Sequence, residues 1–206
     1  MNPPEFNEEI SNTMSGDSQS RSAGESLKIR TPRLELIAAT PQLVRAELAD
    51  LDLFSKMLDA RVPASWPPEL YDRQAAEWTL TYLESEPERA GWALWYCILP
   101  GDASPGRVLA GIAGYKGTPS SEGRVEIGYG VLSEFQRAGY ATEAALALVQ
   151  RAFDHPQIEA VIAETFPDIA ASIRVLEKSG FVLIGPGSEE GTIRFELTRS
   201  RFQREA

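Results

Sequence analysis

Cysteine and histidine are almost absent from this sequence, which contains one residue of each type, Cys97 and His155. A single cysteine excludes an internal disulfide and is compatible with a reducing compartment. Metal sites are usually built from clusters of cysteine, histidine and carboxylate ligands. Because no cysteine–histidine cluster can form, we predict that the protein holds no metal.

Basic residues and long apolar runs are also in short supply. The chain has 20 Lys and Arg residues against 30 Asp and Glu residues, which gives a formal net charge of -10. Proteins that bind nucleic acid usually carry a basic patch or stripe, and none stands out here. No apolar run approaches the roughly 20 residues of a membrane-spanning helix, and the N-terminus lacks a signal-peptide pattern. We therefore expect a cytoplasmic protein that binds neither nucleic acid nor membrane.

The first 26 residues differ in composition from the rest of the chain. The stretch "NEEISNTMSGDSQSRSAGES" is polar, serine-rich and nearly free of large apolar side chains. Such a segment cannot bury enough apolar surface to offset the entropy lost on ordering. We predict a mobile polar tail over residues 1–26 and one folded domain over residues 27–206.

Strand-like and helix-like patterns succeed one another along the folded domain. Helical spacing predicts helices within 41–60 and at 71–85, 139–154 and 168–180, with a proline-rich loop at 61–70. Alternating or apolar runs predict strands at 33–39, 92–99, 107–115, 124–131, 159–166, 181–185 and 191–200. Short connections between consecutive strands favour antiparallel pairing. The expected fold class is α/β, in the layered α+β sense, with a mostly antiparallel central sheet of about seven strands flanked by helices.

Two glycines and a carboxylate share one face of the strand at 124–131. Alternation places Glu126, Gly128 and Gly130 on the same side of the sheet. Glycine weakens a strand, so its presence indicates a bulge, a bend or the close approach of another group. The pattern describes either a groove floor with one acid at its edge or an ordinary bulge beside a solvent-facing glutamate.

The segment after this strand predicts an anion site. "SEFQRAGYATE" ends the strand and opens a helix near Gly139. The first N–H groups of a helix lack internal partners and lie at the positive end of its dipole, which suits them to bind phosphate. Gly139 lets the backbone approach closely, and Arg137 adds a positive charge. The phosphate-loop and dinucleotide motifs, G-x-x-x-x-G-K-[ST] and G-x-G-x-x-G, are both absent here.

The stretch "QRAGYA" fits the pattern [QR]-x-x-G-x-[GA] through Gln136, Gly139 and Ala141. It resembles the loop with which the GNAT superfamily of N-acetyltransferases holds the pyrophosphate of acetyl-CoA. The surrounding "VEIGYGVLSEFQRAGYATEAALAL" and the later "SIRVLEKSGF" extend the resemblance, which covers about residues 27–197 and is greatest to the branch with the ribosomal-protein N-terminal acetyltransferases. It implies acetyl-CoA as co-substrate. It implies cofactor contacts from Val131, Leu132, Gln136, Arg137, Ala138, Gly139, Tyr140, Ala141 and Thr142.

The resemblance also implies acyl transfer to an amine, which needs a base to accept a proton. Glu126 is the first candidate for this base and Glu164 the second, although each fits a solvated strand residue as well. A backbone N–H near Val131 or Leu132 would stabilise the thioester oxygen.

Two positions depart from the family pattern. Many relatives have an asparagine where this chain has Ile169, and some have a proton-donating tyrosine where it has Leu176. Proton donation to the leaving thiolate therefore falls to Ser172, to water or to no group. Ser172 is our candidate for the second catalytic residue.

The acceptor side is predicted from the loop "PASWPPELYD", residues 63–72. In the family this region helps to cover the acceptor, so Trp66 and Tyr71 are candidate substrate-binding residues, although Trp66 also fits an anchor for the loop. The expected acceptor is a primary amine of a small molecule or of a protein N-terminus. The expected assembly is a monomer or a homodimer. The alternative function is a non-catalytic acyl-CoA sensor or scaffold.

Overall fold

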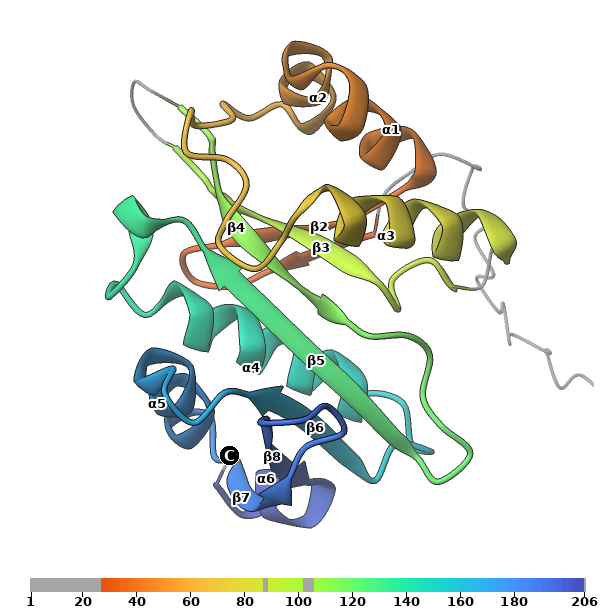
Figure 1. The fold of residues 1–206 in the computed structure, drawn as a ribbon, viewed down its shortest axis with the longest axis vertical. Coiled ribbons are helices and arrows are strands. Elements are labelled where there is room, and N and C mark those ends of the chain that lie inside the picture. Colours follow the sequence, from red (N-terminus) through yellow and green to blue (C-terminus); the bar gives the residue numbers. More distant parts are fainter. Residues whose placement is uncertain (1–26, 87–88, 102–105, 206) are drawn as a thin grey trace, which may run out of the picture.

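The computed structural model describes residues 27–86, 89–101 and 106–205 (Figure 1). The predicted mobile tail at 1–26 lies outside the described residues. Within the described ranges, every helix is too short or too polar to cross a membrane.

Within these described residues, one sheet carries eight strands in the spatial order β1-β2-β3-β4-β5-β6-β8-β7. Neighbouring strands are antiparallel except β5 and β6, which are parallel. The prediction of a mostly antiparallel layered sheet is confirmed, with one strand more than the expected seven. The strands are β1 (Lys28–Arg30), β2 (Glu35–Ala38), β3 (Leu94–Leu99), β4 (Val108–Tyr115), β5 (Arg124–Val131), β6 (Ala160–Thr165), β7 (Val182–Pro186) and β8 (Ile193–Thr198).

In the described part of the chain, six α-helices accompany the sheet, and side-chain caps begin the first three. Thr40 caps the first helix by accepting a hydrogen bond from the N–H of Leu43 at 3.2 Å. Asp72 caps the third helix in the same way, through the N–H of Ala75 at 2.9 Å. Such caps satisfy N–H groups that have no partner inside the helix. The helices are α1 (Pro41–Ala49), α2 (Leu51–Leu58), α3 (Arg73–Ser85), α4 (Tyr140–Phe153), α5 (Ala170–Lys178) and α6 (Arg199–Glu205).

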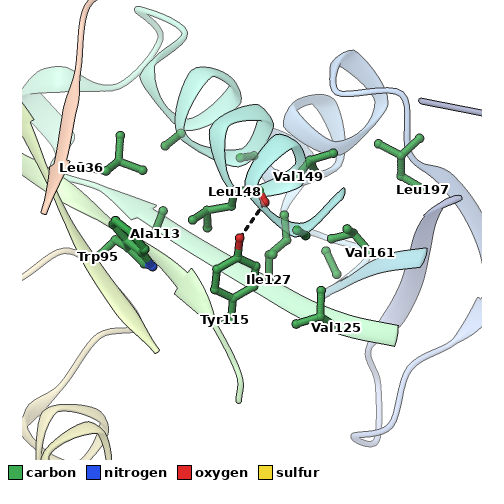
Figure 2. Packing of buried hydrophobic residues seen from close by; sticks show 14 of the residues in the cluster. Leu36, Trp95, Ala113, Tyr115, Val125, Ile127, Leu148, Val149, Val161 and Leu197 are labelled. Atoms are coloured by element: carbon green, nitrogen blue, oxygen red, sulfur yellow. Dashed lines mark hydrogen bonds between the residues drawn. The ribbon is translucent and has the colours of Figure 1, made fainter. Parts of the chain in front are cut away.

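Alternation along the strands divides the apolar core into two layers. On β3, Trp95 and Cys97 face the layer that contains α4 and α5. Tyr96 and Ile98 face the opposite layer, which contains α1, α2 and α3. Figure 2 shows the first layer, where the hydroxyl of Tyr115 donates a 2.7 Å hydrogen bond to a carbonyl of α4. The helices therefore cover both faces of the sheet.

The parallel strands β5 and β6 are paired over only part of their lengths. Their register ends where Ile127 lies opposite Ala163. Beyond that point β5 continues to Val131 along β4, and β6 continues to Thr165 along β8. The two strands therefore separate toward their C-terminal ends, and α4 and α5 follow those ends in the chain. Ligands of sheets with parallel strands characteristically bind at such C-terminal openings.

Candidate active site

The free edge of β5 faces the opening between β5 and β6. In an antiparallel pair, successive residues alternately bond to the partner strand and point away from it. Leu132 donates its N–H to the carbonyl of Ala110 at 2.9 Å, so the N–H and C=O of Val131 point away from β4. Gln136 donates from Nε2 to that carbonyl of Val131 at 3.1 Å. Of the two amides considered for the thioester oxygen, that of Leu132 is therefore occupied and that of Val131 faces the opening.

The turn before α4 has the backbone shape of an anion site. Arg137 has φ +62° and Gly139 has φ +86°, both in the left-handed region. Gly139 is the N-cap of α4 and offers no side chain to its first N–H groups. Arg137, Ala138 and Gly139 are all exposed. Consecutive N–H groups in such a turn form a concave site for an anion, and the helix dipole favours negative charge there.

A residue distant in sequence fastens this turn. Arg33, in the connection between β1 and β2, donates from Nη1 to the carbonyl of Ala138 at 2.8 Å. Its Nε donates to Glu143 at 2.7 Å, and its side chain is 50% exposed. Thr31 also donates to Glu143, at 2.6 Å. Burial alone would raise the pKa of Glu143, but the hydrogen bonds from Thr31 and Arg33 hold it below its ordinary value. The sequence pattern placed Arg33 in a strand and gave no signal for this contact.

The glycine face of β5, which carries Glu126, Gly128 and Gly130, is open at Gly128 and covered at Gly130. A Cβ built on Gly128 meets no atom within 4 Å, whereas one built on Gly130 lies 3.4 Å from Pro68. The carboxylate of Glu126 shares this face, and Lys116 Nζ lies 2.5 Å from its Oε1. The Glu126 side chain is 17% exposed. The strand surface beside Glu126 is therefore open at Gly128, and the role of Glu126 stays a prediction.

Glu164, the second candidate base, is immobilised in a hydrogen-bond network. Its side chain is 3% exposed and accepts hydrogen bonds from Arg194 Nε at 2.7 Å and from the N–H and hydroxyl of Ser188 at 2.9 Å. Burial alone would raise the pKa of Glu164, but these donors lower it to about 2. So acidic a group takes up a proton poorly near neutral pH. The contacts describe an anchor for the connection between β7 and β8.

Ser172 lies on the first turn of α5 and contacts a tyrosine from β5. The hydroxyl of Tyr129 is 3.2 Å from Ser172 Oγ and also 3.2 Å from the Ser172 carbonyl. Tyr129 is the second residue beyond the last β5–β6 pair, so this contact crosses the opening. Burial raises the pKa of Tyr129 to about 12, which keeps its hydroxyl protonated. Leu176, at the position of the family tyrosine, is fully buried and cannot donate a proton.

Trp66 and Tyr71 are buried in the helical layer that covers the glycine face. Both donate to the carboxylate of Glu47, Trp66 through Nε1 at 3.1 Å and Tyr71 through its hydroxyl at 3.2 Å. Tyr96 donates to the same carboxylate at 2.6 Å. Burial raises the pKa of Glu47, and the three hydrogen bonds offset only part of that effect. These contacts anchor the loop, but Trp66 and Tyr71 also line a pocket together with Glu47, so their role in acceptor binding stays a prediction. Pro68 is the residue nearest to Gly130 on the glycine face.

The comparison with known families agrees with this geometry. Residues 42–182 match the acetyltransferase (GNAT) domain family, and they include β5, the glycine turn and α5. The chain belongs to the GNAT family. The predicted superfamily is thereby confirmed.

Two curated proteins are similar to this GNAT chain. Over 75 residues it is 33% identical to the uncharacterized N-acetyltransferase YjdG of Bacillus subtilis, covering 36% of this chain and 45% of that protein. Over 142 residues it is 29% identical to the FsC-acetyl coenzyme A-N(2)-transacetylase of Aspergillus fumigatus, covering 64% of this chain and 59% of that protein. The chain thus spans about half the length of these relatives.

Solved structures share the fold. A crystal structure of RimL, a ribosomal L7/L12 alpha-N-protein acetyltransferase in complex with coenzyme A, superimposes with a TM-score of 0.57. The two sequences are 19% identical, and the alignment covers 84% of this chain and 98% of RimL. At this level of identity the comparison establishes the GNAT fold and not the acceptor.

Proposed function

We propose that this protein transfers the acetyl group of acetyl-CoA to a primary amine. The observation that carries the proposal is the continuity between the free edge of β5 and the glycine turn of α4. The Val131 amide faces the opening, and a few residues later the chain forms an exposed turn with left-handed φ at Arg137 and Gly139. Pantetheine amides fit a strand edge, and a pyrophosphate fits the turn. The site therefore fits acetyl-CoA along its length.

Four residues on or beside β5 have roles in this proposal. Acetyl-CoA supplies a thioester whose carbonyl carbon is attacked by a neutral amine. The N–H of Val131 stabilises the oxygen as it gains negative charge. Glu126 accepts the amine proton, directly or through one water. Ser172 passes a proton to the departing sulfur and recovers one from water, and Tyr129 orients the Ser172 hydroxyl.

The acceptor approaches over Gly128, where the strand surface is open. Pro68 covers the neighbouring Gly130, so the loop at 61–72 borders this approach. Two acceptor classes fit a site of this kind, the primary amine of a small molecule and the α-amine of a protein N-terminus. The name of one structural relative, RimL, gives a ribosomal protein as its acceptor, and one curated relative is named an FsC-acetyl coenzyme A-N(2)-transacetylase.

The test has two parts, which separate catalysis from binding. Calorimetric titration of the full chain with acetyl-CoA measures the site without an acceptor. A thiol-release assay then screens small amines, antibiotics and N-terminal peptides. Tight binding together with turnover of one acceptor class supports the proposal. Tight binding without turnover of any amine would instead favour an acyl-CoA sensor or scaffold, and no binding would reject both.

A further inference from the structure

Arg33 contacts the glycine turn although it lies far from the sequence motif that forms the turn. It approaches from the β1–β2 connection, and its Nη2 lies 3.3 Å from the position of a Cβ built on Gly139. Its guanidinium carbon lies 4.9 Å from the ring centre of Tyr140, the first residue of α4. An ion pair of 2.6 Å with Glu143 fixes its direction, across 110 positions of sequence. The Arg33 guanidinium therefore lies beside the N-terminus of α4.

The hydrogen bond to Ala138 decides what the turn presents to a ligand. A turn binds an anion only when its N–H groups converge on the site and its carbonyls point elsewhere. Arg33 binds the carbonyl of Ala138, directly before the glycine, at 2.8 Å. This contact occupies the carbonyl and draws its negative end away from the N–H groups of α4. Arg33 therefore orders the backbone that the cofactor would meet.

The same guanidinium retains capacity for a ligand. Arginine carries five N–H groups in a planar fork that suits phosphate. Among the described residues, Glu143 and Ala138 engage Nε, Nη1 and Nη2 without occupying every N–H of the two terminal nitrogens. The side chain is 50% exposed, beside the exposed Gly139.

We propose that Arg33 is a phosphate-binding residue of the acetyl-CoA site, and that Glu143 and Thr31 position it. The inference rests on the proposed function, because it assigns a further ligand to the same co-substrate. Arg33 binds a phosphate of the coenzyme A moiety and keeps the turn in its anion-binding shape. The sequence motif, which begins at Gln136, does not contain this residue.

The experiment compares a ligand that has phosphates with one that lacks them. Binding of acetyl-CoA and of S-acetyl-pantetheine is measured by calorimetry for wild type, Arg33→Ala, Arg33→Lys and Glu143→Gln. Arg30→Ala serves as the matched control, because Arg30 is exposed on the adjacent strand. We expect Arg33→Ala to weaken acetyl-CoA binding about 10- to 100-fold, as for a lost hydrogen bond to a charged group. S-acetyl-pantetheine affinity should stay within twofold of wild type.

The remaining variants test the positioning role. Arg33→Lys keeps the charge but not the fork, so its acetyl-CoA affinity should lie between those of wild type and Arg33→Ala. Glu143→Gln should weaken acetyl-CoA binding less than Arg33→Ala, because the guanidinium remains. Equal losses for both ligands in Arg33→Ala would mean that Arg33 only supports the fold, and unchanged acetyl-CoA affinity would mean that it touches no phosphate. Either result overturns the inference. Failure of wild type to bind acetyl-CoA would reject the proposed function itself.

Discussion

Lys116 and Glu126 face each other across the β4–β5 hairpin and are joined twice. The N–H of Lys116 donates to the carbonyl of Glu126 at 2.9 Å, and Nζ lies 2.5 Å from Oε1. The paired backbone fixes both side chains on one face of the sheet, where Gly128 leaves open space. The ion pair thus holds the candidate base on the face where Gly128 leaves open space, and this base is the first target for mutation.

Glu126→Gln should keep acetyl-CoA affinity and lower kcat/KM for the acceptor. An amide cannot take up the amine proton, and loss of a general base typically costs about 10²–10⁴-fold. The defect should shrink as pH rises toward the pKa of the acceptor amine, because more amine is then neutral without help. The measurement is kcat/KM against pH, with Glu122→Gln at the exposed hairpin turn as control. A rate equal to wild type across the range would remove Glu126 from the mechanism.

Gly139→Ala should weaken acetyl-CoA binding by more than tenfold while the protein stays folded. The substitution forces a side chain into left-handed backbone, which costs about 1–2 kcal/mol, and its Cβ would lie 3.3 Å from Arg33. Gly106→Ala is the matched control, because Gly106 has φ +75° and its added Cβ would meet nothing within 4 Å. Calorimetry and thermal unfolding are measured on both variants. Equal affinity in Gly139→Ala and wild type would contradict the assignment of the turn.

Local sequence signals predicted much of this site because each depends on neighbouring residues. The alternation of β5, the cap at Thr40 and the glycine before α4 all act within a few positions. They were enough to predict the glycine face, the start of α1 and the helix N-terminus at Gly139. The three-residue strand β1 carries too short a pattern to be recognised.

Contacts between distant segments were not predictable from the sequence. Glu47 accepts hydrogen bonds from Trp66 and Tyr71 of one loop and from Tyr96 of β3, and no local pattern marks it as their common acceptor. Aromatic residues near a proline-rich loop fit a substrate site as well as a buried anchor. The structure adds that the three rings gather around one carboxylate, and that Trp66 and Tyr71 also line a pocket there.

Ser172→Ala and Tyr129→Phe should behave as one unit. Ser172→Ala removes the proposed proton donor and should lower kcat about 10- to 100-fold. Tyr129→Phe keeps the ring packing and loses only the hydroxyl 3.2 Å from Ser172 Oγ, so its effect should be smaller. Since Tyr129 acts through Ser172, the double variant should be no slower than Ser172→Ala alone. Rate losses that multiply in the double variant would show that the two hydroxyls act independently.

Glu47→Gln should raise the acceptor KM about three- to tenfold, without changing acetyl-CoA affinity. The amide nitrogen replaces an oxygen that accepts from Tyr71 and Tyr96, and mismatched buried hydrogen bonds typically cost about 1–3 kcal/mol. Part of that cost should appear as greater mobility of the loop that covers Gly130 and borders the acceptor approach. Glu77→Gln, on the exposed face of α3, is the control. If Glu47→Gln lowers the stability of the protein and leaves the acceptor KM unchanged, Glu47 stabilises the fold and does not affect acceptor binding.

Glu164→Gln should destabilise the protein in a pH-dependent way and should leave the pH profile of catalysis unchanged. The folded-state pKa of about 2 lies below the ordinary 4.5, so the native state favours the ionised form. This contribution, roughly 3 kcal/mol for a buried group with such a shift, is fully present above pH 4.5 and is lost as pH falls toward 2. Denaturant unfolding of wild type and Glu164→Gln at pH 7, 4 and 3 measures it.

The stability gap between wild type and Glu164→Gln should be largest at pH 7 and should narrow at pH 4 and again at pH 3. Glu122→Gln is the control, because its side chain is 80% exposed and its stability should follow wild type at every pH. If the difference in unfolding free energy stays constant with pH, the negative charge of Glu164 does not contribute to its hydrogen bonds. If instead the acidic limb of the kcat/KM profile is lost in Glu164→Gln and kept in Glu126→Gln, the base lies on β6 and the two carboxylates exchange roles.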